Sequence, residues 1–364
     1  MKKYIIIFIV AFIGGICGFT FGDLGIDMGS IFIFIPVLIL ELILFVISHE
    51  LNHGFAAERN GLKFTVLYLG PFTFKRENKK FKRIKGTSNQ LAYLGRAQID
   101  NGEILNEEDV NKHIKSWIKA LQAGPLSDVI LSIIMIILGF TLKFYVLIAT
   151  TIVIDIFMFL PSYIIGDGKH IKQMKKDKVF SDIILYTYSI AGNTPISKQS
   201  KEFLLKRIVE DINNNVVTKE NLISMTLATQ SAYQGILCED LNSTPKGMEK
   251  IVDMAIKNKN MFLKKQIEQT YYKSLINFSI IYEVIINNNK ERALELYEEV
   301  KNEKHDMPGE KLDYYRVQHV LEIYNRKSEI LNENLMNPVF KGCEGITRIE
   351  EKVNEIILAK SFVR

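Results

Sequence analysis

The residues best suited to chemistry are two histidines and a glutamate in the run His49-Glu50-Leu51-Asn52-His53. Residues four apart lie on one face of an α-helix, because each residue advances about 100° around the helix axis. The two imidazoles can therefore hold one zinc ion, and the carboxylate of Glu50 can take a proton from an attacking water. The pattern predicts metal-assisted hydrolysis, with His49 and His53 as ligands and Glu50 as general base.

The motif lies near the end of a long apolar run. Residues 31–48 are almost entirely apolar, and they are long enough to cross a bilayer as a helix. In a soluble enzyme the same motif would indicate an ordinary metalloprotease. Here we expect the zinc ion to lie at membrane depth.

A third ligand is expected, because a hydrolytic zinc site uses three protein ligands and leaves one position open. Asp167 ends another apolar segment and lies between Gly166 and Gly168, which allow backbones to approach closely. The alternative is that Asp167 and Gly168 only turn the chain out of the membrane. Because Asp167 is expected at the depth of the two histidines, the ligand role is favoured.

Four apolar segments predict four transmembrane helices, at residues 4–21, 31–55, 125–140 and 144–165. The first segment could instead be a signal peptide, but no small-residue cleavage site is evident. Basic residues cluster after the second and fourth segments, whereas the loop after the first contains two aspartates and no base. The positive-inside rule then predicts a multi-pass cell-membrane protein whose termini and active-site side face the cytoplasm.

The loop between the second and third predicted spans has a pattern of its own. Residues 62–69 and 72–74 flank a Gly-Pro turn, which predicts a small membrane-associated β-hairpin or short sheet, with an interfacial amphipathic loop as an equal alternative. An exposed strand at 62–69 could hold an unwound substrate by strand addition. Residues 111–122 predict a short helix, with Trp117 at the headgroup level.

Composition divides the chain into a transmembrane metalloprotease domain, residues 1–174, and a cytoplasmic domain, residues 175–364. The second part is charged, and its apolar residues recur at helical spacing, as in Ala293, Tyr297 and Val300. The expected fold class is an all-α polytopic membrane protein with a C-terminal soluble α-helical domain. A helical-repeat arrangement is an alternative, although no fixed period emerges.

Charge and cysteine usage exclude other classes. The net charge of +5 is modest and its basic clusters adjoin apolar segments, so a lipid bilayer explains them better than nucleic acid, for which no motif is visible. The three cysteines are widely spaced and form neither a disulfide framework nor a Cys-x-x-Cys metal site.

Three further acidic residues, Glu41, Asp128 and Asp155, fall within predicted spans. Charge at bilayer depth is costly, so each is expected to be neutral, paired or beside water. Glu41 could line a water route to the zinc ion, but a hydrogen bond between helices is favoured. The sequence leaves the roles of all three open.

The chain resembles the site-2 protease family (M50) of intramembrane zinc metalloproteases, as a divergent bacterial member. Three motifs carry the resemblance over residues 31–170, in the family's order: His49-Glu50-x-x-His53, Gly124-Pro125-Leu126 and Asp167-Gly168. The strand-like segment also resembles the family's membrane-associated β element.

The resemblance implies a core of three helices that holds zinc and cleaves substrates in or near their own transmembrane segments. It implies that His49, His53 and Asp167 are the ligands and Glu50 the catalytic base. The chain departs from the family at Asp128, where the family often has asparagine, and at Met158. We therefore assign no residue to substrate positioning or to an oxyanion hole.

The sequence thus predicts a zinc-dependent intramembrane endopeptidase that acts on membrane proteins or membrane-associated peptides. The C-terminal helical domain would bind a protein partner. One alternative is a catalytically silent, membrane-anchored binding or regulatory module that uses this helical domain. The other is a small-solute or ion transporter, which the absence of evident inverted repeats disfavours.

Overall fold

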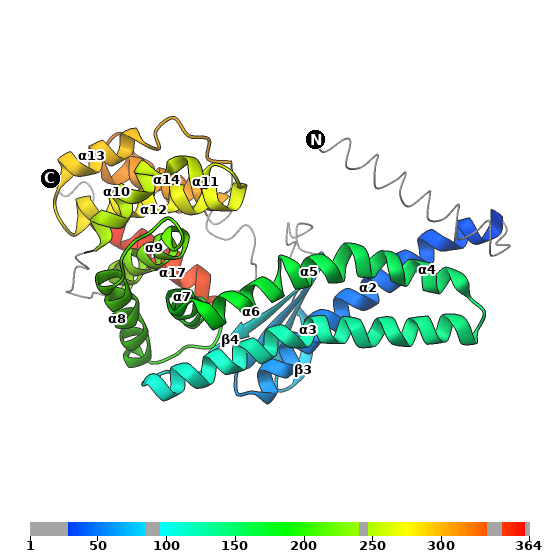
Figure 1. Ribbon diagram of the computed structural model, residues 1–364. Coiled ribbons are helices and arrows are strands. Elements are labelled where there is room, and N and C mark those ends of the chain that lie inside the picture. The colour runs from blue at the N-terminus through cyan, green and yellow to red at the C-terminus, as the bar shows by residue number, and fades with distance from the viewer. Residues whose placement is uncertain (1–27, 85–94, 240–246, 307, 333–343, 361–364) are drawn as a thin grey trace.

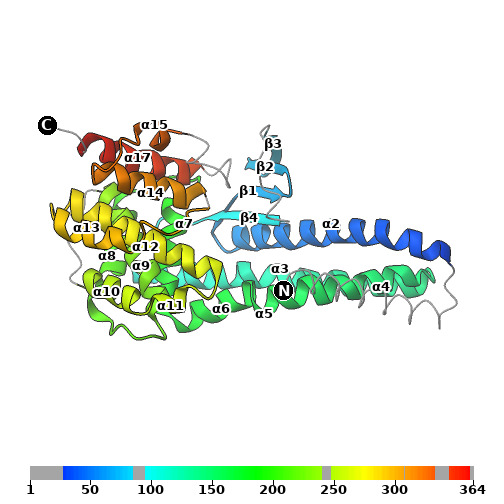
Figure 2. The same ribbon diagram turned by 90° about the horizontal axis from the view of Figure 1, so that it is seen from above.

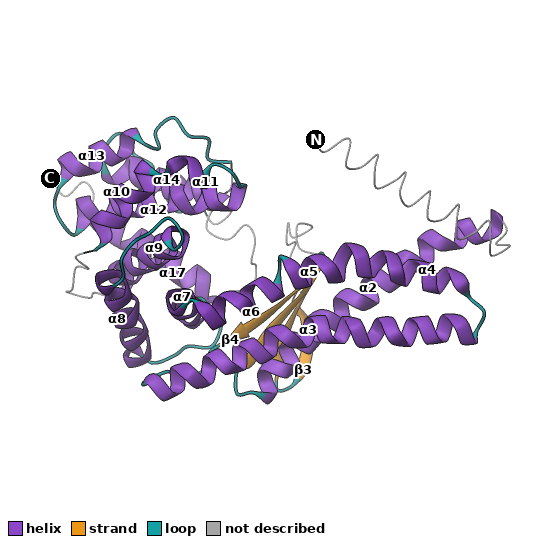
Figure 3. Cartoon of the chain, viewed as in Figure 1, coloured by secondary structure: helices purple, strands orange, loops and turns teal. Residues whose placement is uncertain are grey.

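The protein consists of three long apolar helices and a small β-sheet, followed by a domain built of helices (Figures 1 and 3). This is a computed structural model, which describes residues 28–84, 95–239, 247–306, 308–332 and 344–360. The mostly helical fold and its small sheet agree with the expected fold class.

Three helices in the described part are long and apolar enough to cross a membrane. They are α2 (Met28–Arg59), α3 (Glu107–Thr141), and a third formed by α4 (Tyr145–Ile154), the π-helical turn η1 (Asp155–Phe159), α5 (Leu160–Ile164) and α6 (Asp167–Lys176). They lie side by side (Figure 2). They correspond to the second, third and fourth predicted spans, whereas the first, residues 4–21, lies outside the described residues.

Large apolar side chains cover the outside of these helices. Those of α2 run from Phe32 to Leu44 and those of α3 from Leu126 to Leu142, and many are more than 40% exposed. An apolar surface of this extent would be unfavourable in water, but it suits contact with lipid chains. Inside, Thr151 donates a hydrogen bond to the buried Glu41 at 2.9 Å, as favoured for that carboxyl group.

The strand-like segment belongs to a larger sheet than the predicted hairpin. Four antiparallel strands, β1 (Lys63–Leu69), β2 (Phe72–Glu77), β3 (Lys80–Ile84) and β4 (Gly95–Asp100), lie in the order β3-β2-β1-β4. Because β1 pairs on both edges, it cannot accept a further strand, and the prediction of strand addition at residues 62–69 is wrong. Both β1 and β4 pack against α2.

The short helix predicted at residues 111–122 is the first half of α3, which continues through Gly124 and Pro125. The helix begins where the side chain of Asn106 accepts a hydrogen bond from the backbone N–H of Asp109, a favourable N-cap. A proline inside a helix removes one backbone hydrogen bond without ending the helix when neighbouring elements hold it in place. One rigid element therefore joins the membrane part to the helical domain.

Trp117 lies in this junction, and its depth relative to the lipid headgroups stays a prediction. Its side chain is 4% exposed, its ring packs at a tilt against Tyr188, and its indole N–H donates to the side-chain oxygen of Asn101 at 2.6 Å. Asn101 in turn donates to the carbonyl of Leu185 and to the hydroxyl of Ser189. The residue that follows β4 is thus bonded to both α3 and the helical domain.

The helical domain begins where α6 ends, and the predicted division after residue 174 falls inside α6. Its helices pack around the central α9 and α12. Ala293 and Val300 are buried as predicted, and Tyr297 packs against the same core. The helices are α7 (Lys178–Ile190), α8 (Lys198–Asn214), α9 (Leu222–Glu239), α10 (Met248–Lys257), α11 (Lys259–Phe262), α12 (Gln266–Ile285), α13 (Lys290–Glu298), α14 (Pro308–Val320), α15 (Lys327–Ile330) and α17 (Glu344–Lys360).

Candidate metal centre

The two histidines of the motif face each other from successive turns of α2. The Nε2 atoms of His49 and His53 are 2.9 Å apart, and the rings meet edge to face. His53 is 7% exposed, and the exposed large apolar side chains of α2 end at Leu44, a little over one turn before His49. The pair therefore lies where the apolar surface of the helix ends.

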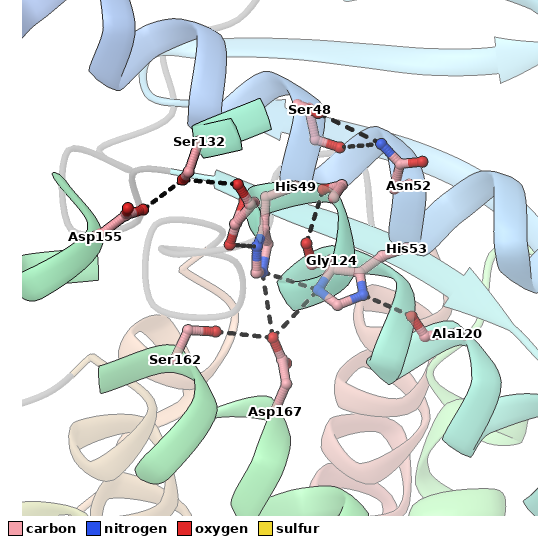
Figure 4. A network of polar contacts seen from close by, with 12 residues as sticks. Ser48, His49, Asn52, His53, Ala120, Gly124, Ser132, Asp155, Ser162 and Asp167 are labelled. Carbon is pink, nitrogen blue, oxygen red and sulfur yellow. Dashed lines mark hydrogen bonds and ion pairs between the residues drawn. The ribbon is translucent and has the colours of Figure 1, made fainter. Parts of the chain in front are cut away.

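Asp167 joins the histidines from a different helix (Figure 4). It is the first residue of α6, and its Oδ2 atom lies 3.2 Å from Nε2 of His49 and 3.3 Å from Nε2 of His53. The hydroxyl of Ser162 donates to the same oxygen at 3.0 Å. The three residues that the sequence named as ligands thus come together from segments 118 residues apart.

The Nδ1 atom of each imidazole ring lies within hydrogen-bond distance of an acceptor oxygen. Nδ1 of His53 lies 2.7 Å from the backbone carbonyl of Ala120, and Nδ1 of His49 lies 2.7 Å from Oδ2 of Asp128. Since a carbonyl can only accept, Nδ1 of His53 carries a proton, and the carboxylate of Asp128 favours the same tautomer for His49. Both Nε2 atoms then present lone pairs to the centre. Metal-binding histidines are usually oriented in this way.

Two imidazole lone pairs and one carboxylate oxygen therefore converge on one point. Electron-rich atoms at these separations repel each other unless a cation lies between them. Ligands that surround zinc tetrahedrally at about 2.0–2.1 Å stand about 3.3 Å from one another, close to the distances found here. The donor set fits a zinc ion that has two nitrogen ligands and one oxygen ligand.

Gly124 of α3 makes room for the rings. A Cβ atom there would lie 2.3 Å from Nε2 of His53 and 2.9 Å from Cε1 of His49, so no side chain fits without displacing them. Gly168 allows the tight turn between α5 and α6 that precedes and holds Asp167, because a Cβ at that position would lie 1.8 Å from the carbonyl oxygen of Tyr163. Gly124 thus lets α3 approach the rings, and Gly168 lets the chain turn beside Asp167.

Glu50 lies between α2 and the edge strand β4. Its carboxylate accepts a hydrogen bond from the backbone N–H of Ala97. A Cβ atom at Gly95 would lie 2.7 Å from Cγ of Glu50, so β4 packs directly on this side chain. Sequence reasoning did not foresee that a strand orients the base.

Among the remaining acidic candidates, Asp128 contacts a histidine of the centre. The only group of metal-binding side chains found in the described ranges consists of His49, His53 and Asp167. The half-buried Asp155 accepts a hydrogen bond from Ser132, not from a histidine. The sequence left the role of Asp128 open, and its signal was a carboxyl group one turn beyond Gly124, in the apolar half of α3.

Comparison with known proteins gives one match. The sequence model of Peptidase family M50 matches residues 37–339, which includes both histidines, Glu50, Asp167 and most of the helical domain. No curated protein and no solved structure matches the chain significantly. The match extends well beyond residues 31–170, where the motifs suggested the likeness. Because this match covers more than half of the chain, the chain belongs to peptidase family M50, a family of membrane metallopeptidases.

Proposed function

We propose that the chain is a zinc-dependent intramembrane endopeptidase that hydrolyses peptide bonds in or near transmembrane segments. The convergence of two imidazole nitrogens and one carboxylate oxygen, each ring oriented through its other nitrogen, carries this proposal. The lipid-facing surface of the three helices that hold these groups supports a substrate that reaches the site from the membrane.

Different residues would bind the metal ion and orient its ligands. His49, His53 and Asp167 would hold the zinc ion, while Asp128 and the carbonyl of Ala120 keep the rings in the tautomer that binds it. When bound, zinc supplies a Lewis acid that lowers the pKa of a water to about 7 and stabilises negative charge on the substrate carbonyl.

Glu50 would act as the general base. It accepts the proton of the attacking water and then passes it to the leaving amine. The hydrogen bond from Ala97 and the packing of Gly95 hold its carboxylate in one orientation. A helical substrate hides its carbonyls in hydrogen bonds, so it must unwind locally before attack.

The proposed orientation places this end of the helices at the cytoplasmic face of the cell membrane. The helical domain is then cytoplasmic, and we propose that it recruits a protein partner or substrate. Its link to the centre supports this role, since Asn101 bonds to α7 and directly follows β4, the strand that packs on Glu50.

Metal removal tests the proposal. The full chain purified in detergent should contain about one zinc per chain, and a chelator should abolish cleavage of membrane peptides, since the site needs the ion for both charge stabilisation and water activation. Zinc added back should restore the cleavage. Mass spectrometry of the peptide fragments and elemental analysis measure the two quantities. Cleavage that persists in zinc-free protein would contradict the proposal.

Asp128 should act as a positioning residue. Asp128→Ala removes the acceptor of the His49 Nδ1–H and should weaken zinc binding by about 10- to 100-fold. Asp128→Asn keeps an acceptor oxygen and should weaken zinc binding less than Asp128→Ala does. Zinc affinity, measured by competition with a chromophoric chelator, separates the two variants.

Asp155→Ala is the matched control for Asp128. It removes another carboxyl group from between α3 and the third helix, but its contact is with Ser132, so zinc affinity should stay near that of the wild type. Equal zinc affinity in Asp128→Ala and the wild type would show that Asp128 does not orient His49.

A further inference from the structure

A cavity of about 770 Å³ lies between α3 and the segment formed by η1, α5 and α6. Its volume is typical of sites that hold a small molecule. Its lining includes none of the three metal-binding side chains, although Gly168 directly follows Asp167.

One end of the cavity is apolar. Leu126 and Val129 of α3 face Phe159 of η1 and Ile164 of α5 across it. Leu126 is 59% exposed and Ile164 is 62% exposed, so this end opens toward the surrounding lipid and not toward the protein core. A hydrocarbon chain from the bilayer can enter it without crossing a polar surface.

The other end of the cavity is basic. Lys169, Lys172 and Lys175 recur every three residues along α6 and line it together. All three are exposed, and none forms an ion pair with an acidic residue in the part of the chain that the structure describes. Three adjacent ammonium groups repel each other, and an anion between them would relieve that repulsion.

The basic end begins where the exposed apolar surface of the helices ends. Lys169 follows the last exposed apolar residue of α5–α6, Ile165, by four residues, and Gln122 lines the cavity on α3 just before its apolar segment begins. Apolar walls below a cluster of lysines at the edge of the bilayer match an anionic lipid in both size and charge.

We propose that this cavity binds one anionic phospholipid of the surrounding bilayer, with an acyl chain between Leu126 and Ile164 and its phosphate among Lys169, Lys172 and Lys175. A neutral lipid would fill the apolar end but leave the ammonium groups unpaired. A transmembrane substrate helix, about 10–12 Å across, would overfill the space. The proposal depends on the membrane position of the helices and not on peptide hydrolysis.

Lipid binding to the purified full chain tests the proposal. The protein in neutral detergent is titrated with fluorescent phosphatidylglycerol and, separately, with the matching phosphatidylcholine. Phosphatidylglycerol should bind saturably and more tightly, and added salt should weaken it, because screening shortens the reach of the lysine charges. Replacing Lys169, Lys172 and Lys175 together by glutamine should weaken phosphatidylglycerol binding by about tenfold or more.

Two control variants isolate the site. Replacing the same three lysines by arginine keeps the charge and should keep the preference for phosphatidylglycerol. A second triple glutamine variant at the exposed Lys219, Lys250 and Lys257 of the helical domain makes the same change in net charge and should bind like the wild type.

Three results would overturn the proposal. One is equal binding of the two lipids by the wild type. Another is an equal loss of binding in both triple glutamine variants, which would indicate a general effect of charge. The third is displacement of the labelled lipid by inorganic phosphate alone at millimolar concentration, which would identify a phosphate site with no need of an acyl chain.

Discussion

Replacement of Glu50 by glutamine will abolish peptide hydrolysis while the protein keeps its zinc. Glutamine has nearly the shape of glutamate, and it can still accept the hydrogen bond from Ala97, so the side chain should stay against β4. It cannot take a proton from water. Loss of a general base should slow hydrolysis by about 10²–10⁴-fold. The zinc should remain, because Glu50 is not one of the three converging donors.

The measurement compares the wild type, Glu50→Gln and Glu108→Gln. Glu108 is exposed in the first turn of α3, and its replacement makes the same chemical change away from the centre. Membranes from cells that express each protein are searched for new peptide N-termini by mass spectrometry, and zinc is measured in each purified protein. New N-termini should occur with the wild type and Glu108→Gln only.

Equal cleavage by Glu50→Gln would contradict the assignment of the base. Equal cellular function of Glu50→Gln and the wild type, without cleavage by either, would instead favour the silent binding module, in which the helical domain carries the recognition. Zinc lost from Glu50→Gln would show that the side chain shapes the metal centre and would remove the basis for treating it as a base alone.

Helical spacing alone was enough to predict that the two histidines of the motif meet. His49 and His53 are four residues apart on one helix, so their meeting depends on local geometry, and the structure shows it. The match between Asp167 and these histidines depended on a further assumption, that helices of similar length begin and end at the same membrane boundary. That assumption worked because the bilayer gives every span the same two limits.

Contacts that the membrane boundary does not constrain could not be predicted from the sequence. Asp128 and His49 are 79 residues apart, and nothing in the order of residues indicates that a carboxyl group on α3 faces Nδ1 and not lipid. The pairing of β1 with β4 crosses residues that carry no strand signal, so the sequence suggested a hairpin where a four-stranded sheet exists. Tryptophan is a residue type typical of membrane interfaces, but Trp117 is buried and donates a hydrogen bond to Asn101.

Replacement of Asp167 by alanine will remove zinc from the protein. Two imidazoles on one helix remain, but the carboxylate oxygen that lies within 3.3 Å of both is lost, together with its negative charge. Loss of a direct ligand should exceed the 10- to 100-fold effect of losing an outer partner, so zinc affinity should fall by more than about 100-fold. Peptide hydrolysis should disappear with the metal.

Asp306→Ala is the control, because Asp306 is an exposed carboxylate in the helical domain. Elemental analysis of the three proteins, purified side by side, should find zinc in the wild type and Asp306→Ala and almost none in Asp167→Ala. His53→Ala should resemble Asp167→Ala, since both remove one of three donors around the same point. If Asp167→Ala kept the zinc that His53→Ala loses, Asp167 would only turn the chain between α5 and α6. The third ligand would then have to come from another group, and the argument from three converging donors would fail.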